Sequence, residues 1–319
     1  MKKSETLVVS DVYIPKKKTL AQKFKANLPL LIMLLPGFLA LLLFHYKPMY
    51  GLSIAFLDYK PRGGILASEF IGFENFATLF DNIYFVDTLK NTIVISFLRI
   101  VCGWPSPIIL ALLLNEIRCG WFKKFTQTLT YIPHFFSWVV LGGIFKMLFS
   151  VEGPINLMIK SLGLEAVPFL MESGPFLFLV ILTAVWQGLG SGAIVYIAAL
   201  AGVDESLYEA AYIDGAGKFR QVISITIPSI MGTITTVFIM NLGGILNAGF
   251  DQLFNLSAGA DMIKNDARIL DTYSYELLLA QKYEMGTTLG LFKSLVGLIF
   301  VLGSNWLVKK MSQDEYGIL

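Results

Sequence analysis

The sequence predicts an all-α membrane protein with six transmembrane helices, and three observations carry this prediction. Of its 319 residues, 55% are apolar and only 15% are charged, whereas soluble domains average about 45–50% apolar and about 25% charged residues. The mean hydropathy is +0.66. Six stretches also reach the length of about 20 mostly apolar residues that a helix needs to cross a bilayer.

These stretches follow one another in chain order. We expect the first to be a retained helix and not a cleaved signal peptide, because a charged segment precedes it and no small-residue cleavage site follows. The second should bend or break around Pro105 and Pro107, and the fifth should begin at Pro228, since proline is favoured in the first turn of a helix. The predicted spans are Leu28–Tyr46, Asn91–Leu114, Gln127–Phe149, Pro175–Leu200, Ser229–Phe250 and Leu289–Val308.

The distribution of Lys and Arg predicts that both ends of the chain are cytoplasmic. With the N-terminus inside, the cytoplasmic segments carry 14 of these residues and the external segments carry 7, and positive residues are retained on the cytoplasmic side. The expected organisation is a basic N-terminal segment 1–27, a six-helix membrane domain 28–308 with a cytoplasmic loop 203–228, and a tail 309–319.

Composition and motifs argue against several classes of protein. The formal net charge of +2 does not suggest a nucleic-acid binder, and two cysteines with two scattered histidines resemble neither a disulfide framework nor a zinc site. The letters G-x-G-x-x-A at Gly188–Ala193 lie in an apolar span and not after a strand, so we interpret the small residues there as helix packing. No nucleophile–base pair or nucleotide site is evident; the chain is expected to be no enzyme and to bind no metal or cofactor itself.

The charges inside the predicted spans bear on one class of membrane protein, the ion-coupled carriers. Ion-coupled carriers usually keep Asp or Glu within the helix bundle, and none of the six spans has an acidic residue in its interior. A carrier driven by an ion gradient therefore remains only an alternative. Arg99 lies deep in the second span. Either it lines a path through the membrane or the span begins further along the chain.

The loop between the fourth and fifth spans carries the most specific pattern. Ser206 followed by Glu209 has the spacing of a capping box, which predicts a short helix from about Asp204 to Ile213. Gly215 and Gly217 then allow a turn, and 218–225 can form a second short helix. Taken alone, this pattern is also that of a simple surface turn between helices.

The residue types in this loop favour a more specific interpretation than a simple surface turn. Six residues stand at the spacing of the EAA motif, E-A-A-x3-G-x9-I-x-L-P, and Ile227 takes the place of the leucine. The loop thus resembles the signature of permease subunits in binding-protein-dependent ABC importers. The resemblance implies that this loop is the coupling helix, which docks on an ATPase subunit. The implied coupling residues are Glu209, Ala210, Ala211, Asp214, Gly215, Ile225 and Pro228.

Further segments extend the resemblance over nearly the whole chain. They are similar to the LplB-type branch of the maltose-permease superfamily and stand at Tyr46–Tyr59, Ala111–Arg118, Tyr131–Val140, Asp271–Leu279 and Gly290–Ser294. The resemblance implies a type I (MetI-like) importer fold in the bacterial cell membrane. It also implies a second similar permease, giving a heterodimer, two ATPase subunits that hold ATP and magnesium, and an extracytoplasmic solute-binding protein that delivers an oligosaccharide.

A sugar path needs hydroxyl partners and aromatic faces within an apolar wall. The fourth span offers Trp186, Gln187, Ser191 and Tyr196, and the fifth offers Asn241 and Asn247. The resemblance places Gln187, Gly188, Ser191, Asn241 and Gly244 along the path, with Asn241, Gly244 and Ala248 expected on one helical face. The alternative is that Gln187 and Asn241 only join helices by hydrogen bonds. An importer for a non-carbohydrate solute also remains open.

Overall fold

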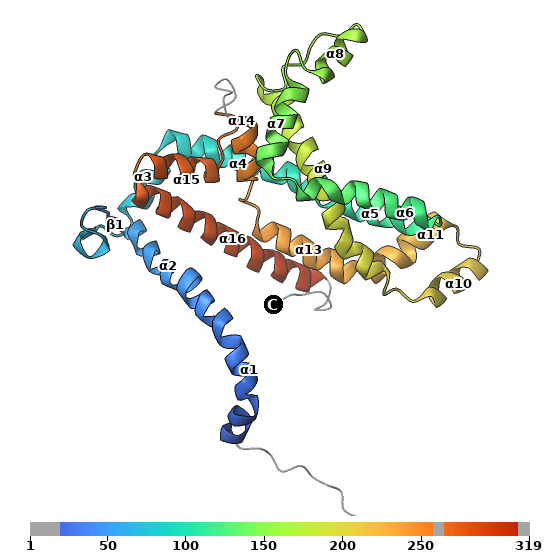
Figure 1. Ribbon diagram of the computed structural model, residues 1–319, viewed down its shortest axis with the longest axis horizontal. Helices are drawn as coiled ribbons and strands as arrows, with labels where there is room; N and C mark the ends of the chain where they lie inside the picture. Colours follow the sequence, from blue (N-terminus) through green and yellow to red (C-terminus); the bar gives the residue numbers. More distant parts are fainter. Residues whose placement is uncertain (1–19, 258–264, 312–319) are drawn as a thin grey trace, which may run out of the picture. The chain divides into compact units, whose positions relative to one another are not determined.

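The computed structural model describes residues 20–257 and 265–311, and the described chain is almost entirely helical (Figure 1). It divides into two compact units, Met1–Ser53 and Ile54–Leu319. Most of the predicted basic segment 1–27 and of the tail 309–319 lies outside the described residues. The division into 1–27, 28–308 and 309–319 therefore stays a prediction.

The first unit consists of one long apolar helix and its irregular continuation. Pro29 and Pro36 lie inside the helix, and a stretch of π-helix follows it. Residues Asn27–Phe56 together form a candidate membrane span that contains the predicted span Leu28–Tyr46. The elements are α1 (Leu20–Leu41), the π-helix η1 (Leu42–Tyr46), α2 (Lys47–Met49) and the 3-10 helix η2 (Tyr50–Phe56), whose last residues enter the second unit.

The second unit opens with a small cap and continues as helices. Its first half comprises β1 (Leu57–Asp58), η3 (Ile65–Ala67), β2 (Glu69–Phe70), α3 (Glu74–Phe80), α4 (Ile83–Gly103), α5 (Pro105–Glu116), α6 (Gly120–Tyr131), η4 (Ile132–Phe135), α7 (Trp138–Phe149) and α8 (Pro154–Ser161). Its second half comprises α9 (Ser173–Leu200), α10 (Glu205–Ile213), α11 (Lys218–Gln221), the π-helix η5 (Val222–Thr226), α12 (Ile227–Ser229), α13 (Met231–Gly243), α14 (Phe250–Ser257), α15 (Leu270–Leu279) and α16 (Tyr283–Met311).

The cap is held by one buried side chain. Strands β1 and β2 pair antiparallel, with Leu57 opposite Phe70. The Asn75 side-chain amide donates to the carbonyl oxygens of Ala55 and Leu57, both at 3.0 Å. These bonds satisfy backbone groups that the short strands leave unpaired.

Helix lengths agree with most of the predicted spans. Among the described residues, five helical stretches are long and apolar enough to cross a membrane, and a sixth arises if one bent pair counts as a single span. Helix α9 matches the predicted span Pro175–Leu200 closely, and α16 contains Leu289–Val308. Helices α4 and α5 form the candidate span Ile83–Glu116, broken at Trp104 just before Pro105, as the prolines predict.

The third predicted span, Gln127–Phe149, is wrong as a continuous helix. Helix α6 ends at Tyr131, and α7 begins at Trp138 after η4 and an extended Phe136. Pro133 explains the interruption, because proline has no N–H to donate and its ring clashes with the preceding turn. The candidate span at this point is Trp138–Ser161.

The fifth predicted span, Ser229–Phe250, is also shorter and more bent than expected. Helix α13 ends at Gly243, and the chain before it, Lys218–Ser229, meets it at an angle of 64° across Ile230. Pro228 therefore lies in the last turn of the preceding helical stretch and does not open α13. The Gly243–Gly244 pair accounts for the early end, because glycine is the poorest helix former after proline.

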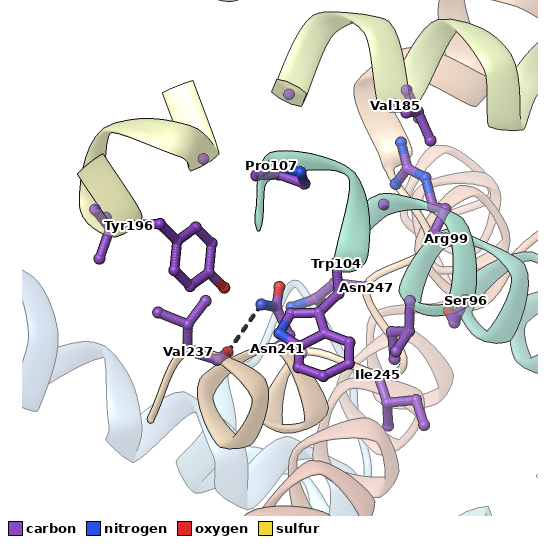
Figure 2. A pocket seen from close by; sticks show the side chains of 17 residues that line it. Ser96, Arg99, Trp104, Pro107, Val185, Tyr196, Val237, Asn241, Ile245 and Asn247 are labelled. Atoms are coloured by element: carbon purple, nitrogen blue, oxygen red, sulfur yellow. Dashed lines mark hydrogen bonds between the residues drawn. The ribbon is translucent and has the colours of Figure 1, made fainter. Parts of the chain in front are cut away.

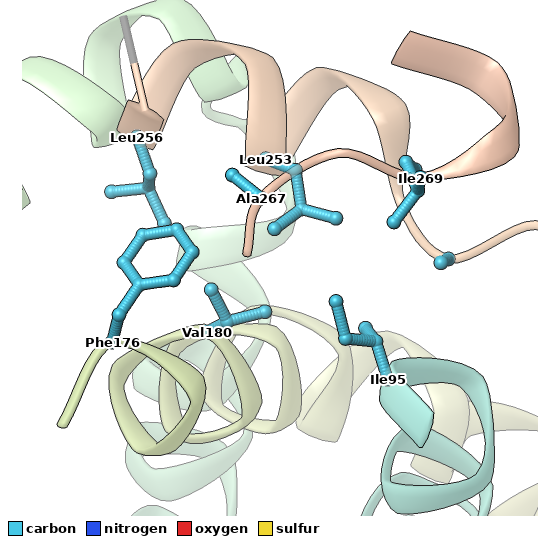
Figure 3. Packing of buried hydrophobic residues seen from close by; sticks show 8 residues of the cluster. Ile95, Phe176, Val180, Leu253, Leu256, Ala267 and Ile269 are labelled. Atoms are coloured by element: carbon cyan, nitrogen blue, oxygen red, sulfur yellow. The ribbon is translucent and has the colours of Figure 1, made fainter. Parts of the chain in front are cut away.

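The cores of the second unit lie where helices distant in sequence meet. Helix α5 packs along α9, and α13 packs along α16. Figure 3 shows Phe176 and Val180 of α9, Ile95 of α4, and Leu253 and Leu256 of α14 meeting in one buried cluster. This cluster joins α4, α9 and α14, and α4 and α9 also line the cavity described next.

Candidate functional site

A cavity of about 360 Å³ lies between α4, α5, α9 and α13 (Figure 2). All four helices and the turn after α13 contribute lining residues. The lining residues are Ser96, Arg99, Ile100, Gly103, Trp104, Pro107, Ala184, Val185, Gly188, Gly192, Val195, Tyr196, Val237, Asn241, Gly244, Ile245 and Asn247.

Five of the eight predicted path residues line this cavity: Gly188, Tyr196, Asn241, Gly244 and Asn247. The structure therefore brings together residues from two predicted spans that are some fifty positions apart. Their role in binding a solute stays a prediction. Tyr196 is buried with its hydroxyl toward the cavity, while the Asn241 amide donates to the Val237 carbonyl at 2.8 Å.

The other three predicted path residues do not line the cavity. Trp186 packs edge-to-face on Phe145, with 5.7 Å between ring centroids. The Gln187 amide donates to the carbonyl of Phe136 at 3.4 Å, and the Ser191 hydroxyl donates to the Gly188 carbonyl at 3.1 Å. The helix-joining interpretation thus describes Gln187, whereas Ser191 bonds within its own helix.

The predicted helical face through Asn241, Gly244 and Ala248 is wrong, because α13 ends at Gly243. Gly244 caps that helix, and the Asn247 N–H donates to the Gly244 carbonyl at 2.7 Å in the following turn. Asn247 and Gly244 reach the cavity through this turn, and Ala248 is buried in the neighbouring core.

Sequence reasoning missed the wall made by α4 and α5. Ser96, Ile100, Gly103 and Pro107 recur at intervals of three or four residues, which places them on one helical face. The sequence contains this period, but hydropathy does not tell which face of an apolar helix lines a cavity. Arg99 lies on the same wall, so the structure favours the interpretation that it lines a path.

A second hollow, of about 510 Å³, adjoins the turn after α13. Asn247 borders both this hollow and the first cavity. The hollow also contacts Tyr275 and the ion pair between Lys293 and Asp271. Phe250, Phe254 and Tyr275 form an aromatic cluster at its edge, with ring centroids 5.4–5.8 Å apart.

The loop between α9 and α13 forms a helical hairpin, as predicted. Helix α10 spans Glu205–Ile213, and its N-cap is Asp204, whose carboxylate accepts from the Ser206 N–H at 2.9 Å. The predicted capping box of Ser206 and Glu209 is therefore wrong. Aspartate is an equally good N-cap, and the predicted helix from about Asp204 to Ile213 is itself confirmed.

Gly215 makes the turn that the motif predicts. Its φ is +77°, a left-handed conformation that glycine adopts at little cost. The second half of the hairpin, α11, η5 and α12, runs on to Ser229 and is longer than the predicted 218–225. Ile225 lies in the π-helical turn η5, and Pro228 lies in α12.

One part-buried hydrogen bond joins the two halves of the hairpin, and a second ties its turn to α11. The Tyr208 hydroxyl donates to Thr226 Oγ1 at 3.0 Å, and the Gln221 amide donates to the Ala216 carbonyl at 3.1 Å. Both Thr226 and Gln221 are buried. The hairpin can therefore move as one body, because its halves share these contacts.

The outer face of the hairpin is apolar and exposed. Tyr212, Ile213 and Phe219 are each 79–85% exposed, and none of the α10 residues is buried in this chain. Glu209, Ala210, Asp214 and Gly215 are also exposed, and Ala211 is half-buried. A cluster of large apolar side chains beside a carboxylate is typical of a protein-docking surface.

Comparisons with known proteins agree with these features. Residues 103–313 match the family model described as "Binding-protein-dependent transport system inner membrane component". Protein LplB of Bacillus subtilis (strain 168) is 41% identical over 89% of this chain and 90% of its own length. The polygalacturonan/rhamnogalacturonan transport system permease protein YteP of the same strain is 43% identical over 94% of this chain and 93% of its own length.

A solved structure shares the fold as well as the sequence. It is described as a bacterial alginate ABC transporter in complex with alginate pentasaccharide-bound periplasmic protein. One of its chains is 34% identical and superposes with a TM-score of 0.85, over 94% of this chain and 100% of the other. With its apolar helices and its EAA-type hairpin, this chain belongs to the family of inner membrane components of binding-protein-dependent transport systems.

Proposed function

We propose that this chain is a permease subunit of an ABC importer that moves an oligosaccharide or polysaccharide fragment across the cell membrane. The exposed hairpin carries this proposal, since it presents the motif residues and an apolar face to a partner. The relatives named for sugar polymers support the class of solute. ATP and magnesium are held by the partner, and the chain itself acts as a transport subunit.

Alternating access follows from the connection between the hairpin and the cavity. ATP binding closes the ATPase dimer, the docked hairpins move with it, and the helices around the cavity change the side to which it opens. Helix α9 ends directly before the hairpin and α13 begins directly after it, and both line the cavity. A displacement of the hairpin therefore reaches the cavity walls through two continuous helices.

The assembly we propose contains two permeases, two ATPase subunits and an extracytoplasmic solute-binding protein. The alginate transporter named above is described in complex with a periplasmic protein, which supports a binding-protein partner. The second permease is expected to be a similar but different chain. The protein would lie among lipids of the bacterial cytoplasmic membrane, in keeping with the family description.

We further infer six spans with both ends in the cytoplasm. The bent pair Lys218–Ser229 and Met231–Gly243 supplies the sixth, with α13 as its membrane part. The excess of Lys and Arg in the predicted inner segments, 14 against 7, supports this orientation. It puts the hairpin and an ATPase partner on the same side.

Reversing one charge on the hairpin tests the proposal. Glu209→Lys should abolish sugar uptake while the binding protein still holds its sugar, because a lysine would replace the carboxylate that faces the ATPase. Uptake is measured in cells, and ATPase co-purification is measured with the extracted complex. Glu205→Lys makes the same charge change on the same helix outside the motif and should retain uptake.

The outcomes separate the alternatives. Normal uptake with Glu209→Lys would contradict a coupling role for the hairpin. Transport by the chain alone in liposomes, driven by an ion gradient, would support the ion-coupled carrier. ATPase stimulation by a non-carbohydrate solute and by none of the sugars would support the importer for another solute.

A further inference from the structure

Arg99 places a positive charge halfway along a membrane span. It lies sixteen residues after the start of the candidate span Ile83–Glu116 and seventeen before its end. An ionised side chain at that depth is costly in hydrocarbon and usually faces a bundle interior or a water-filled cavity. Arg99 does so, since it lines the cavity between α4 and α9.

The charge has no counter-ion within the described chain. All described ion pairs lie elsewhere. Its described hydrogen-bond partner is neutral: Arg99 Nη2 donates to Gln252 Oε1. A glutamine orients the guanidinium without cancelling its charge, so the cation stays available to a ligand.

Gln252 is itself fixed by a fully buried set of contacts. Its Nε2 donates to the Val180 carbonyl and to Thr183 Oγ1, both at 2.7 Å, and the side chain is 0% exposed. With its amide nitrogen used on α9, only its oxygen remains for Arg99. Gly249 leaves room on the other side, because a Cβ there would overlap the guanidinium.

Polar groups that can bind hydroxyls line the same cavity as the cation. Ser96 Oγ is buried and has no hydrogen-bond partner among the described residues. Trp104 Nε1 and Tyr196 OH are also buried in this lining, and their side chains interact with each other. A buried polar group without a partner destabilises the protein, because it has lost its bonds to water. A ligand that carries hydroxyls together with a carboxylate would satisfy all of these groups at once.

We propose that Arg99 binds the carboxylate of an acidic sugar, so that the solute carried is an oligosaccharide containing hexuronic acid residues. In this proposal Gln252 and Thr183 are positioning residues for the guanidinium, which can meet a carboxylate with two parallel N–H···O bonds. The inference rests on the proposed function, since it names the solute of that importer.

The test compares acids with their neutral esters. The complete transporter, with its partner permease, ATPases and binding protein, is placed in lipid nanodiscs. ATPase stimulation is titrated with trisaccharides of galacturonate, mannuronate and glucuronate, and with their methyl esters. The same binding protein serves every preparation, so a change between variants belongs to the permease.

We expect at least one acid to stimulate the ATPase at a concentration about tenfold lower than its methyl ester does. A difference of this size corresponds to the loss of one charge-assisted contact. Arg99→Gln should bring the ratio of the effective ester concentration to the effective acid concentration close to one. Arg99→Lys should keep most of the tenfold ratio. Gln252→Glu should also abolish it, because the new carboxylate pairs with Arg99 inside the protein. That second variant keeps the test decisive if Arg99→Gln does not assemble.

Lys90→Gln is the matched control, since it removes one positive charge from the same helix on its exposed part. The ratio should survive in this variant. An equal loss in Lys90→Gln, or equal potency of acids and esters in the unmodified transporter, would overturn the inference and leave the importer assignment standing. Stimulation by a non-sugar solute, and by none of these sugars, would overturn both.

Discussion

Two glycines of α9 set how closely the neighbouring helices approach it. A Cβ on Gly190 would overlap the backbone carbonyl of Thr130 in α6, and one on Gly192 would lie 2.8 Å from the ring of Pro107 in α5. The packing interpretation of the small residues therefore holds for Gly190 and Gly192. Gly188 has nothing within 4 Å of such a Cβ, and it opens onto the cavity instead.

Gly190→Ala should lower the stability of the membrane domain. The new methyl group has to displace the backbone of α6, and such overpacking typically costs about 1–3 kcal/mol. Thermal unfolding of the detergent-solubilised protein measures the effect. Gly188→Ala adds the same methyl group where there is space, so an equal loss of stability in that variant would refute the packing argument.

At the scale of the elements, the hairpin depends on a single N-cap. The hydrogen bond from the Ser206 backbone N–H holds the pKa of the Asp204 carboxyl below its usual value. Because the folded pKa is the lower one, the cap contributes stability above the usual Asp pKa of about 3.9. That contribution disappears as the pH falls through the depressed value.

Asp204→Ala should therefore fray the first turn of α10 and weaken ATPase coupling. Asp204→Asn should keep the helix, since asparagine caps as well as aspartate, and it should remove the pH dependence. Hydrogen exchange of the α10 amides, followed from neutral to acidic pH, distinguishes the variants. Equal exchange in Asp204→Ala and the unmodified chain would count against the cap.

The stiffness of the hairpin rests on the Tyr208–Thr226 bond. Tyr208→Phe and Thr226→Val each remove it, and we expect either variant to assemble while its ATPase responds less to sugar. The double variant should be no worse than the single ones, with a coupling energy of about 0.5–1.5 kcal/mol in a stability cycle. Strictly additive effects would show that the two side chains act independently.

How far the sequence predicts these elements depends on the signal each one carries. The predictions of α9 and α16 are confirmed, because a long apolar run with no proline beyond its first turn predicts a single continuous helix. The third and fifth spans were wrong at Pro133 and Gly243, where the apolar run continues but the backbone cannot remain helical. The wall of α4 and α5 required tertiary contacts, since hydropathy does not tell which face of an apolar helix meets a cavity.

At the scale of the whole molecule, orientation decides what the cavity and the hairpin can do. In the proposed orientation the hairpin meets its ATPase partner in the cytoplasm, and the hollow beside Asn247 receives the solute from outside. The unit Met1–Ser53 contains 7 of the 14 Lys and Arg residues in the predicted inner segments. The positive-inside rule therefore makes one prediction for the entire chain, and the native cysteines allow it to be tested.

Cys119 stands exposed between α5 and α6, on the predicted cytoplasmic side. With Cys102 replaced by Ser, a membrane-impermeant maleimide should label Cys119 in inside-out vesicles and not in intact cells. Leu66→Cys, at a site 94% exposed in the cap, should show the opposite pattern in a chain lacking both native cysteines. If Cys119 were labelled from outside, the hairpin would face away from ATP, and the coupling mechanism would fail together with the topology.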